Sequence, residues 1–162
     1  MEEKKLEISY EHFSSAEELI EEERNLLQTA MDAANTAHAP YSHFHVGCAV
    51  LLDSGEIITG NNQENIAFPS GLCAERTALF YVGSQQKAEQ ISKIAIRAYS
   101  TKEGSNIDVP VFPCGGCRQV MVEYEKQANR KVIVVVQGET GDIIRLNGIE
   151  QTLMPFHLNI QL

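Results

Sequence analysis

The sequence predicts an α/β fold, a three-layer α/β/α sandwich on a five-stranded mixed sheet. Three observations predict it: an apolar hairpin pattern over residues 45–59, a strand–helix–strand pattern over 91–137, and helical patterns around both. A crossover of that length implies a parallel, right-handed βαβ unit, whereas the hairpin implies antiparallel pairing. No repeat, low-complexity tract or linker divides the chain.

A first helix is expected over residues 16–37. Ser15 precedes Glu18 by three positions, which is capping-box spacing, and apolar residues follow at helical intervals. Pro40 prevents its continuation. We interpret the Glu run of this helix as its solvated face. Before it, the alternating Leu6-Glu7-Ile8 is either an added strand or disordered.

The remaining elements follow from local patterns. A Val-rich strand over 45–52 and a second over 57–59 flank the turn Asp53-Ser54-Gly55-Glu56, which predicts a β-hairpin. Val132-Ile-Val-Val-Val136 is typical of a strand buried on both faces. The other expected elements are, in order, a helix over 73–83, a strand over 91–98, a loop over 100–110, a helix over 114–127, strands over 131–137 and 142–146, the last antiparallel, and a closing helix over 149–157.

Length and charge limit the classes of protein. The chain has 162 residues and a formal charge of −9, and residues 1–24 carry nine Glu against three basic residues, a net of −6. We expect an acidic N-terminal extension over 1–13 and a single domain over 14–162. The absence of a basic stripe argues against a nucleic-acid partner and favours small uncharged ligands. No stretch resembles a membrane span or a secretory signal, so we expect a cytoplasmic protein.

The four cysteines indicate metal or reactive thiols in a reducing compartment. Cys114-Gly-Gly-Cys117 begins one predicted helix, and Cys73 begins another, 41 positions upstream. A C-x-x-C by itself also fits a redox dithiol, because helix N-termini lower thiol pKa values. If the two helix N-termini face each other, however, three thiolates meet at one site where the helix dipoles favour them.

Three thiolates suit zinc, and their number predicts the kind of site. A structural zinc takes four protein ligands, whereas a catalytic zinc takes three and keeps a water. Cys48 lies within the hairpin strand, and we interpret it as a core residue. We therefore predict an open site with one Zn²⁺ per chain, held by Cys73, Cys114 and Cys117. Glu75 is close enough to act on a zinc-bound water; the alternative is a first-turn Glu stabilised by the helix dipole.

A Cys-x-Glu followed by Pro-Cys-x-x-Cys resembles the known signature of zinc deaminases, in which the Glu is the general acid/base, so this assignment rests on resemblance. Four ordered motifs resemble the small three-cysteine cytidine deaminases, and the resemblance covers about residues 20–158. The motifs are Ala39-Pro-Tyr-Ser-x-Phe-x-Val-Gly47, Asn62-x-Glu-Asn65, Cys73-Ala-Glu-Arg-Thr-Ala78 and Pro113-Cys-Gly-x-Cys-Arg-Gln119.

The resemblance implies a cytidine deaminase-like fold and an activity. The reaction is hydrolytic deamination of cytidine and deoxycytidine to uridine and deoxyuridine plus ammonia, a step of pyrimidine salvage. Zinc activates the water that attacks C4 of the base, and Glu75 shuttles the protons. Arg76 corresponds to an Arg that hydrogen-bonds the ligand sulfurs and offsets their charge; without the resemblance, a surface ion pair is the alternative.

The resemblance also assigns substrate contacts. Asn62 and Glu64 correspond to the ribose-hydroxyl binders, and a carboxylate there both accepts from a hydroxyl and repels a phosphate. Their alternative is an Asn-rich turn. Phe44 corresponds to an aromatic that packs against the base, or else it is a core residue, and the Ala74 backbone corresponds to a group that hydrogen-bonds the base. His43 and His45 have no family role.

Family members of this kind are homotetramers whose active sites borrow groups from neighbouring chains. Phe68 stands where the family usually has Tyr, near the sugar or the subunit contact. The family places an intersubunit aromatic three residues after a Pro near the C-terminus. Here Leu158 occupies that position after Pro155, and Phe156 is the candidate contact.

Other functions remain as alternatives. A deaminase of another cytosine nucleoside, such as blasticidin S, is the nearest, but that group lacks the Asn-x-Glu-Asn sequence. Nucleotide, transfer-RNA and polynucleotide deaminases commonly use His as the first ligand and need basic residues for phosphates. A non-catalytic zinc-binding module or a dithiol redox protein would not need Glu75.

Overall fold

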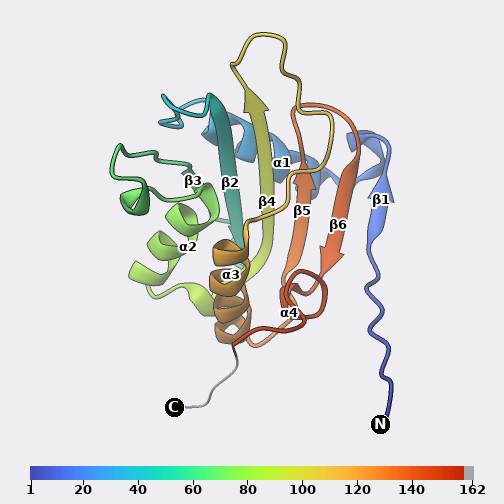
Figure 1. Cartoon of the computed structure of the whole chain (residues 1–162). Helices are drawn as coiled ribbons and strands as arrows, with labels where there is room; N and C mark the ends of the chain where they lie inside the picture. Colours follow the sequence, from blue (N-terminus) through green and yellow to red (C-terminus); the bar gives the residue numbers. More distant parts are fainter. Residues whose placement is uncertain (159–162) are drawn as a thin grey trace.

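The computed structural model describes residues 1–158 as a six-stranded mixed sheet between two helical layers (Figure 1). The strand order is β1-β6-β5-β4-β2-β3, with β4 and β5 parallel and the other neighbours antiparallel. The predicted α/β/α class is confirmed. The strands are β1 (Glu11–Phe13), β2 (Phe44–Leu52), β3 (Ile57–Asn61), β4 (Ile91–Ser100), β5 (Ile133–Gln137) and β6 (Ile143–Asn147); the helices are α1 (Glu21–Ala34), α2 (Ala74–Ser84), α3 (Gly115–Ala128) and α4 (Ile149–Thr152).

The predicted count of five strands is wrong because β1 adds a sixth at the edge of the sheet. Glu11 lies opposite Arg145 of β6, whose guanidinium donates to both Glu11 carboxylate oxygens at 2.7 and 2.8 Å. The same guanidinium lies over the Phe13 ring, 5.3 Å from its centroid. The strand has only three residues and does not include residues 6–8, so its pattern is too short to detect in the sequence.

The first predicted helix is divided in two. The capping box of Ser15 and Glu18 is present, but it caps a single 3₁₀ turn, Ala16–Glu18. Leu19 is extended and 4% exposed, and α1 begins only at Glu21. Burial of Leu19 in the core beneath α1 accounts for the break, because the helical conformation ends where the chain turns inward.

The Glu run of α1 is not wholly a solvated face. Glu23 is 1% exposed and accepts from Lys93 Nζ of β4 at 2.9 Å and from Arg145 Nη1 of β6 at 3.0 Å. A buried carboxylate needs such partners, since removing one leaves a buried unpaired charge. The acidic N-terminal region is thereby bonded to two strands of the sheet.

The helices cover opposite faces of the sheet, α1 on one and α2 with α3 on the other (Figure 1). Two glycines allow the close approach of these layers. A Cβ on Gly47 would lie 1.8 Å from the Ala30 carbonyl oxygen of α1. A Cβ on Gly60 would lie 2.5 Å from the Ala78 nitrogen and 2.7 Å from the Ala74 oxygen of α2. Gly60 therefore sets how closely the N-terminal half of α2 lies against β3.

The hairpin and the strand–helix–strand unit agree with the sequence prediction. β2 pairs antiparallel with β3, and β4 pairs in parallel with β5 after the α3 crossover. The closing helix is shorter than predicted: α4 ends at Thr152, because the residue before Pro155 is disfavoured in helical conformation. Among residues 1–158, no helix combines the length and apolarity needed to cross a membrane.

Candidate metal centre and active site

Two helix N-termini converge on one side of the sheet and bring three cysteines together. Cys73 is the N-cap of α2, Cys114 is the N-cap of α3, and Cys117 lies in the first turn of α3. The Cys73 and Cys114 sulfurs are 3.9 Å apart, and those of Cys114 and Cys117 are 3.4 Å apart. All three lie within 4.8 Å of one another. The structure thus brings Cys73 together with the other two predicted ligands, which lie 41 and 44 positions later in the sequence.

The cluster fits zinc in donor type and in spacing. Zinc–thiolate bonds of ~2.3 Å in a tetrahedral site place sulfurs about 3.8 Å apart. Cys48 is fully buried in the core beneath α2 and α3 and is not part of the cluster. Three protein donors leave one coordination position for a water, which is the arrangement of a catalytic zinc.

Charges around the sulfurs favour thiolate at Cys73. Hydrogen bonding from the Cys117 thiol and then from the Arg76 guanidinium lowers the pKa of Cys73 to about 5. Arg76 Nη2 lies 3.6 Å from the Cys73 sulfur, which is the contact implied by the resemblance. Hydrogen bonding to Cys73 and burial raise the pKa of Cys117, since its thiol is the donor of the pair. Arg76 thus supplies a positive charge beside a cluster that becomes anionic when it holds a metal.

Glu75 is buried beside the sulfurs. It is the second residue of α2 and is 4% exposed. Burial, with a further contribution from the Cys73 charge, raises the pKa of the Glu75 carboxyl. Glu75 lies in the first turn of α2, as the helix-dipole alternative also requires. A raised pKa makes a carboxyl group better able to accept a proton and return it.

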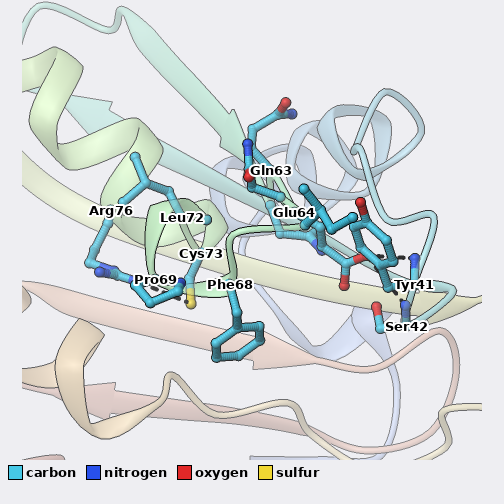
Figure 2. Close-up of a pocket in the computed structure, with 13 residues that line it drawn as sticks. Tyr41, Ser42, Gln63, Glu64, Phe68, Pro69, Leu72, Cys73 and Arg76 are labelled. Atoms are coloured by element: carbon cyan, nitrogen blue, oxygen red, sulfur yellow. Dashed lines mark hydrogen bonds between the residues drawn. The ribbon is translucent and has the colours of Figure 1, made fainter.

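A cavity of about 800 Å³ opens beside this cluster (Figure 2). Cys73 and Arg76 lie at one end of it, Glu64 lies at the other, and Phe68 lies between them. Asn62 also lines it. The other predicted site residues are not among its lining: Phe44, Ala74, Glu75, Cys114, Cys117 and Phe156. One cavity therefore connects a metal ligand to the Glu64 carboxylate.

Glu64 is held by two residues without a predicted role, Tyr41 and Ser42. Its Oε2 accepts from the backbone N–H of Tyr41 at 2.9 Å and of Ser42 at 3.3 Å. Hydrogen bonding from the Ser42 side chain, followed by these backbone bonds, lowers the pKa of Glu64, so its carboxylate stays charged. Tyr41 and Ser42 belong to the first of the four family motifs, and only this position in the motif pointed to a functional role from the sequence.

The remaining predicted substrate contacts lie close to β2 and α2. The Asn62 side chain accepts from Val46 N at 2.8 Å and donates to the Phe44 carbonyl at 2.9 Å. The Oδ1 atom of Asn62 can accept one further hydrogen bond, and its Nδ2 atom can donate one further hydrogen bond. Phe44 begins β2 and is half-buried, and Ala74 is the fully buried first residue of α2.

Two aromatic residues predicted for subunit contact are exposed. Phe68 is 89% exposed and Phe156 is 86% exposed. The two histidines without a predicted role do not join the cluster: His43 has a left-handed backbone with φ of 57°, and His45 stacks on Tyr99 with ring centroids 4.9 Å apart.

Residues 20–136 match the sequence model of a protein family, the cytidine and deoxycytidylate deaminase zinc-binding region. The chain belongs to this family. A cytidine deaminase of Halalkalibacterium halodurans is 39% identical over 118 residues, which cover 73% of this chain and 83% of that protein. The crystal structure of cytidine deaminase from Burkholderia pseudomallei matches with a TM-score of 0.71 and 32% identity over 83% of this chain and 97% of that one. The crystal structure of cytidine deaminase from Mycobacterium tuberculosis matches with a TM-score of 0.61 and 27% sequence identity. That match covers 84% of this chain and 96% of that one.

Membership in this deaminase family confirms the resemblance inferred from the four motifs. It also confirms the predicted enzyme class, a zinc-dependent hydrolytic deaminase, and the predicted cofactor. The redox-dithiol alternative is disfavoured because the C-x-x-C pair shares its site with Cys73.

The cysteine assignments can be separated by metal analysis. We expect Cys117→Ala to lower bound zinc from one per chain to below about a tenth of that, because two thiolates hold zinc far more weakly than three. Cys48→Ala is the matched control, since it also removes a buried sulfur, and it should retain one zinc per chain. Mass spectrometry of the metal in dialysed protein measures both. Equal zinc content in the two variants would contradict the assignment.

Proposed function

We propose that this deaminase converts cytidine and deoxycytidine to uridine and deoxyuridine with release of ammonia, a step of pyrimidine salvage. The observation that carries the proposal is the cavity with a metal ligand, Cys73, at one end and the charged Glu64 at the other. The first end suits the amidine carbon of a cytosine ring, and the second suits the hydroxyls of an attached sugar. The named activities of the relatives support the same substrate class.

Cys73, Cys114 and Cys117 would hold the zinc, which would supply Lewis-acid activation of the attacking water. Glu75 takes a proton from that water, gives a proton to N3 of the base, and later assists departure of ammonia from C4. Burial suits Glu75 to both halves of this task, because the raised pKa lets the carboxyl hold a proton between steps. Arg76 keeps the sulfur cluster from being too anionic to activate water.

Glu64 selects the sugar and its charge. Two backbone N–H groups fix its Oε2, so the carboxylate is oriented before substrate binds. A charged carboxylate accepts strongly from ribose hydroxyls and repels a 5′-phosphate. This favours a nucleoside over a nucleotide, and Asn62, which also lines the cavity, supplies a further amide contact to the sugar.

The base is held by the chain around the two helix N-termini. Ala74 offers its backbone at the first position of α2, directly between Cys73 and Glu75. Phe44 supplies an aromatic ring at the start of β2 for packing against the pyrimidine. Both roles follow the family pattern.

Replacement of the acid/base isolates its role. We expect Glu75→Gln to retain one zinc per chain and to lower kcat for cytidine by about 10²–10⁴-fold or more, because the amide cannot carry the proton. Glu22→Gln, in the first turn of α1, is the control and should retain full turnover. The decrease in ultraviolet absorbance of cytidine measures both. Full activity of Glu75→Gln would refute the assignment.

A substrate panel tests the sugar site and the blasticidin alternative. We expect kcat/KM for cytidine and deoxycytidine to exceed that for free cytosine by at least about 100-fold, since hydrogen bonds to a charged group contribute about 1.5–3 kcal/mol each. CMP and blasticidin S should be poor substrates. Glu64→Gln should lower kcat/KM for cytidine and reduce the ratio of kcat/KM for cytidine to that for CMP. Comparable rates for cytidine and cytosine, or preference for blasticidin S, would count against the proposal.

We infer a homotetramer with shared active sites, in the cytoplasm. Phe68 and Phe156 are large aromatic side chains that the single chain leaves in water, as residues that contact a second subunit would be. Light scattering after gel filtration should give a mass of four chains, and Phe68→Asp should shift it towards smaller species. A wild-type mass of a single chain, about 18.0 kDa, would contradict the tetramer.

A further inference from the structure

The carbonyl group that precedes each N-cap cysteine is held by a hydrogen bond, but the two donors differ. Before Cys73, Leu72 pairs with Gln63 through both backbone groups, at 2.9 and 3.0 Å. Before Cys114, Pro113 cannot donate, and its carbonyl accepts from a side chain instead. Arg118 Nε, one residue beyond Cys117, donates to that carbonyl at 2.8 Å.

The second end of the Arg118 guanidinium is anchored elsewhere. Nη1 donates to the Leu153 carbonyl, just after α4, at 3.2 Å. That carbonyl lies at a helix C-terminus, where backbone acceptors lack helical partners. The neighbouring Gln119 accepts from Leu158 N at 3.2 Å, a second bond between α3 and the C-terminal segment. Two anchors fix the plane of the guanidinium, so it presents Nε to Pro113 in one direction.

We propose that Arg118 is a positioning residue of the metal centre, which sets the direction of the Cys114 sulfur by holding the Pro113 carbonyl. The Pro113 carbonyl and the Cys114 nitrogen belong to one planar peptide group. The proline ring already restricts φ of Pro113, so the orientation of this plane depends mainly on ψ. A bond to the carbonyl restricts ψ and with it the Cα of Cys114.

The geometry gives Arg118 this task because, within residues 1–158, the segment before Cys114 lies outside any helix or strand that would fix its backbone. β4 ends at Ser100, and the next regular element, α3, begins at Gly115. Cys114 is also exposed, whereas Cys117 lies within α3 and is 0% exposed. Of the three sulfurs, the one on Cys114 is therefore the least fixed by its surroundings. The hydrogen bond from Arg118 to Pro113 restricts its position instead.

Metal affinity tests the proposal without substrate. Arg118→Met keeps the length of the side chain and removes both bonds, and Arg118→Lys keeps the charge and can make one of them. Arg97→Met is the matched control: Arg97 also donates from Nε and a terminal nitrogen to two loop carbonyls, those of Gly138 and Glu139, at 3.2 and 2.7 Å. Ala95, two residues earlier on β4, packs beneath α1, so Arg97 lies on the face opposite the cysteines.

We expect Arg118→Met to bind zinc about 100-fold more weakly, the upper range for loss of a group that orients a ligand, in competition with a chromogenic chelator. Arg118→Lys should recover part of this and lie about tenfold below wild type. The Co²⁺-loaded Arg118→Met protein should also show altered visible bands, because one thiolate is misdirected. Arg97→Met should match the wild type in both measurements.

Wild-type zinc affinity in Arg118→Met, or an equal loss in Arg97→Met, overturns the proposal. If Arg118→Met does not fold, Arg118→Lys decides, and wild-type affinity in that variant overturns it. The proposal concerns the metal centre of the proposed function, but its failure is distinguishable from failure of that function. A wild-type protein that binds zinc and leaves cytidine unchanged refutes the function and leaves the role of Arg118 standing.

Discussion

The site depends on two helices that begin at the same place. Thiolates repel one another, so a cluster of them is stable only where positive charge meets it. The N-termini of α2 and α3 provide partial positive charge, and Arg76 provides a full one. The sheet brings the two N-termini together. Helix α2 packs closely against β3 at Gly60, and α3 is the crossover that connects β4 to β5. Metal binding, the burial of Glu75 and the cavity all follow from this meeting point.

The acidic N-terminal region is part of the scaffold on the other face of the sheet. Arg145 bonds both Glu11 and Glu23, and Lys93 bonds Glu23. These cations lie on β6 and β4, so the negative charge of the N-terminus is partly neutralised by the body of the protein. Part of the acidic charge of the N-terminal region therefore lies in structural ion pairs. In the proposed function, Glu64 selects the charge of the substrate locally.

Elements with strong local patterns were predictable, and elements that depend on distant partners were not. The hairpin, α3 and β5 follow from apolar periodicity and turn residues. The edge strand β1 forms because Arg145, more than 130 positions away, bonds Glu11. The break at Leu19 and the burial of Glu23 have the same origin, since both depend on what the sheet presents to α1.

The sequence by itself determined the chemistry of the ligands and the family, because residue types and short spacings are local properties: Cys-x-Glu and Cys-x-x-Cys identify a zinc deaminase before any fold is known. Only the tertiary structure decided which groups meet and in what state of charge. It brought Cys73 to Cys114, buried Glu75 so that its pKa rises, and held Glu64 by the Ser42 side chain and two backbone groups so that its pKa falls. These are long-range effects of desolvation and hydrogen bonding, and they exist only when the layers have packed.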